Sequence, residues 1–256
     1  MQHNTSIILI ILYFGFNLNL IAQDKSQEHS NDKKILQLID LVDAYTQDKE
    51  FDSLQYVVFD LYDLAQSVGS AKQKAIAEMN LGYYYGFNAK YDSSQVYYLK
   101  AIEHFESLGE DYLLAKTYRE FSTVLATGYG DFEKASELVI QSIQLLEPIG
   151  DSLEIMSSYF NLAYTYSLAG QKDEALEILS RVETFALTIS DSTLLFQVYR
   201  NKGSIYYDLY EDDKAYEYQL KAKSMGNQDP RFWNNLILSL ANTAASIGQF
   251  DEALAN

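Results

Sequence analysis

Residues 161–176, NLAYTYSLAGQKDEAL, decide the fold of this chain. The first half of the stretch continues an apolar pattern at i, i+3, i+4 and i+7, the spacing of one helical face: Tyr159, Leu162, Ala163 and Tyr166. Gly170 suits a chain reversal, and a second helix is expected from Asp173. That helix also carries an apolar face: Ala175, Leu176, Leu179, Val182 and Ala186. The stretch therefore predicts a helix hairpin whose two apolar faces need partners.

The start of the second helix recurs along the chain at steps of 38 to 41 residues. In each of the six copies an acidic residue precedes a mostly small residue by two positions: Phe51–Leu54, Tyr91–Ser94, Phe132–Ala135, Lys172–Ala175, Asp212–Ala215 and Phe250–Ala253. A fixed step of this length is typical of stacked supersecondary units that share one continuous core. We therefore expect an all-α protein, an α-solenoid in the form of a right-handed superhelix, with about six hairpins. Only two prolines occur, and both fall between expected helices.

The repeated pattern resembles the tetratricopeptide repeat. The second unit supplies nearly all of the positions that the resemblance requires: Leu81, Gly82, Tyr85, Tyr91, Ser94, Tyr98 and Ala101. The third unit departs from it, with Ser122, Thr123 and Ala126 in place of a large apolar, a small and an aromatic residue. The step near 40 residues is also longer than the usual 34 of the family. In this respect the units resemble the subgroup with longer tetratricopeptide repeats. The expected units are 33–69, 70–110, 111–150, 151–190, 191–228 and an incomplete 229–256.

The two ends of the chain carry their own predictions. Residues 1–22 contain an apolar run that ends at Ala22, which predicts a cleaved secretory signal peptide and hence an exported, extracytoplasmic protein of a bacterial envelope. Residues 23–32 are expected to form a short polar linker. The sequence stops early in the second helix of the sixth unit, so we expect a longer protein. A membrane association is expected only through a possible segment beyond Asn256.

Composition excludes several classes of function. The chain has 36 acidic and 19 basic residues and a formal charge of −17, which argues against nucleic acid and against an anionic membrane surface as partners. It has no cysteine, so disulfides and thiolate metal sites are excluded.

Motifs for catalysis or for cofactor binding are lacking. His104, the one histidine within the array, lacks a second histidine four residues away and is interpreted as a surface or interhelical residue. No phosphate loop, nucleophile elbow or dinucleotide fingerprint occurs. We therefore expect no catalytic residue, no metal and no cofactor.

The resemblance implies that the first helix of each unit lines a concave groove that binds a protein or peptide. Matched by position, the candidate contact residues are Met79, Asn80, Tyr83 and Phe87, then Phe160, Asn161 and Tyr164, then Arg200, Asn201, Ser204 and Tyr207. Tyrosine and arginine often dominate binding energy at interfaces. The family's clamp for peptide carboxyl termini is not reproduced, because its lysines are missing here.

These observations favour an exported, non-catalytic scaffold for protein–protein or peptide binding. The alternative is the extracytoplasmic sensor region of a membrane-bound histidine kinase or of a helix-turn-helix transcriptional regulator. A third hypothesis, an enzyme with its active site in the groove, would need clustered titratable residues there.

Overall fold

The computed structural model describes residues 30–46, 51–226 and 230–248, and within these ranges the chain is helical without any strand. The predicted all-α fold is confirmed. A first helix covers residues 30–46. It is followed by α2 (Phe51–Val68), α3 (Ala71–Phe87), α4 (Tyr91–Leu108), α5 (Asp111–Val124), η1 (Leu125–Tyr129), α6 (Phe132–Leu146), α7 (Ser152–Leu168), α8 (Lys172–Ile189), α9 (Ser192–Asp208), α10 (Asp212–Ser224) and α11 (Pro230–Ser246).

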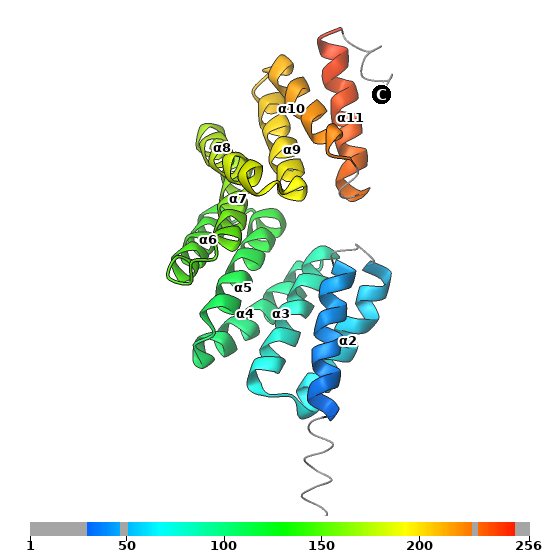
Figure 1. Ribbon diagram of the computed structural model, residues 1–256, viewed down its shortest axis with the longest axis vertical. Coiled ribbons are helices and arrows are strands. Elements are labelled where there is room, and N and C mark those ends of the chain that lie inside the picture. The colour runs from blue at the N-terminus through cyan, green and yellow to red at the C-terminus, as the bar shows by residue number, and fades with distance from the viewer. Residues whose placement is uncertain (1–29, 47–50, 227–229, 249–256) are drawn as a thin grey trace, which may run out of the picture.

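Successive helices pack as hairpins and the hairpins stack into a curved array (Figure 1). The most extensive contacts join the two helices of a unit, as in α3 with α4, α5 with α6, α7 with α8 and α9 with α10. Each second helix also contacts the first helix of the next unit. The predicted α-solenoid is therefore the observed architecture.

Short links carry the signals that end one helix and begin the next. Gly109 ends α4 in the left-handed conformation, with φ 66°. Ser190 takes the same role at the end of α8 with φ 57°, which is unusual for a residue with a side chain. Asp151 then caps α7, because its carboxylate accepts a hydrogen bond from the Glu154 amide at 3.1 Å.

Small residues let the two helices of a hairpin approach each other. Ser94, Ala135, Ala175 and Ala215, the small residues that define the repeat, are all fully buried. In the second unit the Ser94 hydroxyl donates to the Gly82 carbonyl at 2.7 Å. A Cβ at Gly82 would lie only 2.8 Å from the Tyr98 ring, so this helix crossing requires glycine.

The third unit departs from regular helical geometry where its sequence departs from the pattern. After Val124 the helix widens into the π-helical turn η1, which ends at Gly130 with φ 66°. Within η1, Gly128 lies against Tyr91 so closely that a Cβ would be 2.5 Å from the Tyr91 ring. Such wide turns are rare in proteins, and those that occur often lie at functional sites.

The chain ends are only partly described. Residue 30, the first described residue, is already helical, so residues 30–32, expected from the sequence to be part of a polar linker, are helical. The predicted signal peptide, residues 1–22, lies outside the described residues, as does the start of the second helix of the sixth unit. No helix in the described part of the chain is long and apolar enough to cross a membrane.

Candidate functional site

The first helices of the units form one continuous surface, here called the inner face. Helix α3 contacts α5, α5 contacts α7, α7 contacts α9, and α9 contacts α11. Helices on the inside of a curved stack lie closest to one another, so this series identifies the concave side of the array (Figure 1). All of the candidate contact residues predicted from the sequence lie on α3, α7 or α9.

The four candidates on α3 have different surroundings. Met79 is 8% exposed and belongs to the core around Phe105 and Phe121, which leaves it little surface for a partner. The Asn80 amide donates to the Ile76 carbonyl of its own helix at 2.9 Å. Tyr83 and Phe87 are partly buried and line a pocket described below.

The candidates on α7 lie in the middle of the inner face. Phe160 is partly buried against the core of units four and five. The Asn161 amide donates to the Arg119 carbonyl of α5 at 3.3 Å and so ties two first helices together. Burial raises the pKa of the Tyr164 hydroxyl, and the nearby Arg200 guanidinium partly offsets this effect.

On α9 the candidates range from buried to exposed. Asn201 is 6% exposed and is therefore mainly a packing residue. The Arg200 guanidinium lies 4.1 Å from the centroid of the Phe232 ring of α11, so its outer methylenes and its charge also support packing. Ser204 and Tyr207 are exposed. Arg200 and Ser204 line a shallow pocket of ≈ 180 Å³ between α9, α10 and α11.

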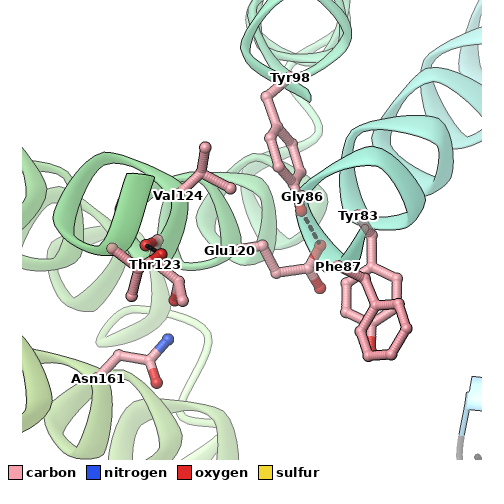
Figure 2. A pocket seen from close by; sticks show the side chains of 9 residues that line it. Tyr83, Gly86, Phe87, Tyr98, Glu120, Thr123, Val124 and Asn161 are labelled. Atoms are coloured by element: carbon pink, nitrogen blue, oxygen red, sulfur yellow. Dashed lines mark hydrogen bonds between the residues drawn. The ribbon is translucent and has the colours of Figure 1, made fainter. Parts of the chain in front are cut away.

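A pocket of ≈ 310 Å³ lies between α3, α5 and α7 and is here called the inner-face pocket (Figure 2). It brings together three residues predicted from the sequence, Tyr83, Phe87 and Asn161. Its lining is completed by Gly86 of α3, Tyr98 of α4, Glu120, Thr123 and Val124 of α5, and Thr127 of η1. A volume of this size is at the lower end of ligand pockets and suits one side chain of a partner rather than a whole peptide.

Sequence reasoning missed Glu120, the acidic group of this pocket. Its carboxyl group accepts a hydrogen bond from the Tyr98 hydroxyl at 3.4 Å, and Figure 2 shows both side chains extending toward each other beside the rings of Tyr83 and Phe87. The sequence signal was the departure of the third unit from the repeat pattern. That departure indicated a weak repeat, but it did not indicate which polar residue would face the groove.

Burial sets the electrostatics of the pocket. Desolvation raises the pKa of the Glu120 carboxyl above its ordinary value, although the positive charges of Arg119 and Lys116 oppose the shift. The pKa of the Tyr98 hydroxyl is raised well above its usual value, first by burial and then by the Glu120 charge. Perturbed carboxyl groups in a cleft are candidates for functional residues.

No group of three or more His, Asp or Glu residues in the described ranges has the geometry to hold a metal ion. His104 lies between helices, with its Nδ1 atom 2.7 Å from the Glu78 Oε2 atom of α3. Helix α4 therefore uses its histidine to hold α3.

Comparison with known proteins agrees with this architecture. The sequence profile of the tetratricopeptide repeat matches residues 157–185, which span most of α7, the turn and most of α8. A search of curated protein sequences finds no significant match.

Among solved structures, NprR in complex with its cognate peptide NprX superposes with a TM-score of 0.70 and 20% identity. The match covers 88% of this chain and 64% of that one, so the chain spans less than two thirds of the NprR chain.

A signal transduction ATPase with a tetratricopeptide repeat sensor, from Pyrococcus horikoshii, gives a TM-score of 0.68 at 14% identity, covering 87% and 35% of the two chains. PilW, a type IV pilus biogenesis factor, gives 0.62 at 14% identity, covering 86% and 88%. At these identities the likeness shows the fold. Residues 157–185 thus match the tetratricopeptide-repeat profile, and the chain as a whole shares the α-solenoid fold of these solved structures.

Proposed function

We propose that this protein is an exported, non-catalytic scaffold that binds a protein or an extended peptide along its inner face. One observation carries the proposal: a pocket of side-chain size opens between three successive first helices and is lined by aromatic, amide and carboxyl groups. Aromatic rings in such pockets supply much of the binding energy at protein interfaces, while amide and carboxyl groups select the partner. A solved relative in fold, NprR, is described in complex with a peptide.

Export is a separate part of this proposal. It is supported by the apolar run of residues 1–22 that ends at Ala22. If the chain is expressed in a bacterium with its own leader, the intact mass of the mature protein should correspond to a terminus at Gln23. Recovery of the uncleaved chain in the cytosol would contradict export while leaving peptide binding to be judged separately.

Peptide binding is tested by selection from a phage library of random dodecapeptides, followed by affinity measurements with the purified protein. Truncation of two pocket residues, Phe87→Ala with Asn161→Ala, should weaken the selected peptides by more than about tenfold, because interface-centre truncations cost about 2 kcal/mol each. The matched control is Tyr56→Ala on the second helix α2, where the ring is 74% exposed.

Circular dichroism melting should show that both variants keep the fold. If no peptide is selected, or if the control weakens binding as much as the pocket variant, the inner face is not the binding surface.

A second candidate is a sensor region of a larger signalling protein. It is favoured by coverage: the chain matches 64% of the NprR chain and 35% of the signal transduction ATPase, so in both cases the array is one part of a longer protein. The complete reading frame decides this point. A run of about 20 apolar residues beyond Asn256, followed by kinase or helix-turn-helix motifs, would identify a membrane-bound sensor.

A further inference from the structure

The inner-face pocket contains an acidic group whose charge is poorly balanced by its surroundings. Within the described residues, no nitrogen of Lys, Arg or His lies within 4.0 Å of the Glu120 carboxylate. Its nearest hydrogen-bond donor, the Tyr98 hydroxyl, is neutral and 3.4 Å away. A partly buried carboxylate without a cation loses hydration that no ion pair restores.

The two nearby cations are engaged elsewhere. Arg119 forms an ion pair with Glu154 of α7, and both side chains are largely buried. The Lys116 ammonium group lies 5.9 Å from the centroid of the Tyr112 ring, on the side of α5 that holds Tyr112. The charges of Arg119 and Lys116 reduce the pKa shift of Glu120, but neither side chain lines the pocket.

The other walls of the pocket also favour a cation. Tyr83, Phe87 and Tyr98 line it with aromatic rings, whose faces attract positive charge. Thr123 and Thr127 add short polar side chains at the rim. Their hydroxyl groups suit a donor-rich head group such as guanidinium or ammonium.

The charge of the whole chain points in the same direction. With a formal charge of −17 the protein repels acidic partners and attracts basic ones over the range set by the Debye length. An apolar guest would leave the Glu120 charge still less hydrated, and an acidic guest would be repelled by it. Charge complementarity therefore selects a basic guest.

We propose that the inner-face pocket binds one lysine or arginine side chain of the peptide partner, with the Glu120 carboxylate as its counter-ion and the rings of Tyr83, Phe87 and Tyr98 as its walls. This inference rests on the proposed function and adds the chemistry of the partner: a basic peptide. It also gives Glu120 a role that packing alone does not provide.

The test uses three small probes of nearly equal shape with the full chain: n-butylguanidinium, the neutral n-butylurea and the anionic pentanoate. Each is titrated while the side-chain carboxyl resonances of ¹³C-labelled glutamate and the ring resonances of tyrosine and phenylalanine are followed by NMR. Butylguanidinium should shift the resonances of Glu120 and Phe87 and bind about tenfold or more tightly than butylurea, because a desolvated cation contact on rings and carboxylate is worth a factor of this size. Pentanoate should not bind.

Charge removal provides the matched variants. Glu120→Gln should abolish the preference for butylguanidinium over butylurea, while Glu174→Gln, which removes an exposed carboxylate from α8, should preserve it. Equal binding of butylguanidinium and butylurea by the unchanged protein would overturn the proposal. So would a preference that survives Glu120→Gln.

The selected dodecapeptides separate the two proposals. Peptides that carry a shared Lys or Arg and lose affinity in Glu120→Gln support both. Peptides that need the inner face but share an apolar or acidic residue overturn the basic-guest inference and leave the binding function intact. A failure of the selection, with butylguanidinium still bound at Glu120, would contradict the peptide-binding function alone.

Discussion

The α5–α6 and α7–α8 hairpins occupy equivalent places in the array but differ in regularity and in the polarity of their inner surface. In the second hairpin Leu162, Ala163 and Tyr166 follow the repeat pattern, and α7 is a regular helix of 17 residues. In the first, the corresponding positions hold Ser122, Thr123 and Ala126, and the helix widens into η1.

This difference indicates which part of the array carries specificity for a partner. In the regular hairpin, packing between helices explains which residue types occur at the repeat positions. In the irregular hairpin, Glu120, Thr123 and Thr127 of α5 and η1 line the inner-face pocket. Local departures from a repeat are where natural sequences place function at the expense of stability.

The largest expected effect is on packing in the regular hairpin. Leu179 of α8 is fully buried in the core that joins units four and five. Leu179→Ala should lower the free energy of unfolding by about 2–5 kcal/mol, measured by urea denaturation, because it leaves a cavity. Leu187 on the same helix is 55% exposed, and Leu187→Ala should stay within about 0.5 kcal/mol of the parent. Equal costs for the two variants would show that our assignment of the buried face of α8 is wrong.

The next effect probes the irregular hairpin. Gly128 of η1 lies against the Tyr91 ring, where a Cβ would be 2.5 Å from the ring carbon Cγ. Gly128→Ala should therefore cost about 1–3 kcal/mol through overpacking. The neighbouring exposed residue serves as control, and Thr127→Ala should change the urea midpoint little. A neutral Gly128→Ala would mean that η1 readily reverts to a regular helix and that its wide turn is not held by this contact.

A smaller effect compares how the two first helices begin. The Asp151 side chain caps α7, whereas Glu110 precedes α5 without any side-chain hydrogen bond to the helix. Asp151→Ala should cost about 1 kcal/mol through loss of the cap. Glu110→Ala should cost less, because it removes only an exposed ion pair with Lys72. Thermal melting of both variants checks the order, which would be reversed if the Lys72 pair dominated.

The sequence predicts the array well but the pocket only in part. Helical spacing and the step near 40 specify the hairpins, because each apolar face must be covered by the next unit. The inner face follows from the same repetition, which places Tyr83, Phe87 and Asn161 on first helices whose side chains line one pocket. Repetition cannot place Glu120, because the third unit breaks the pattern from which positions are read. It also assigned Met79 and Asn201 to the accessible face, although contacts between neighbouring helices bury both.

The smallest expected effect is a gain of stability at the irregular hairpin. Burial raises the pKa of Glu120 in the folded state above its ordinary value of 4.5. The folded protein therefore holds this proton more tightly than the unfolded chain. The contribution of Glu120 to stability is fully present below its unfolded pKa and is lost as pH rises through the folded pKa. Once it is ionised, the partly buried carboxylate lowers the stability of the fold.

Glu120→Gln removes that cost, because the amide carbonyl can still accept the Tyr98 hydrogen bond without carrying a charge. The variant should melt at a higher temperature than the parent at pH 7, and the difference should shrink at pH 4, where the parent carboxyl is mostly protonated. Glu174→Gln on the regular hairpin should show no such gain, since its side chain is exposed. A parent that is more stable than Glu120→Gln at pH 7 would mean that the carboxylate is well paired inside the folded protein. A less stable parent, together with loss of basic-probe binding in the variant, would mean that the pocket retains a destabilising charge because a basic guest requires it.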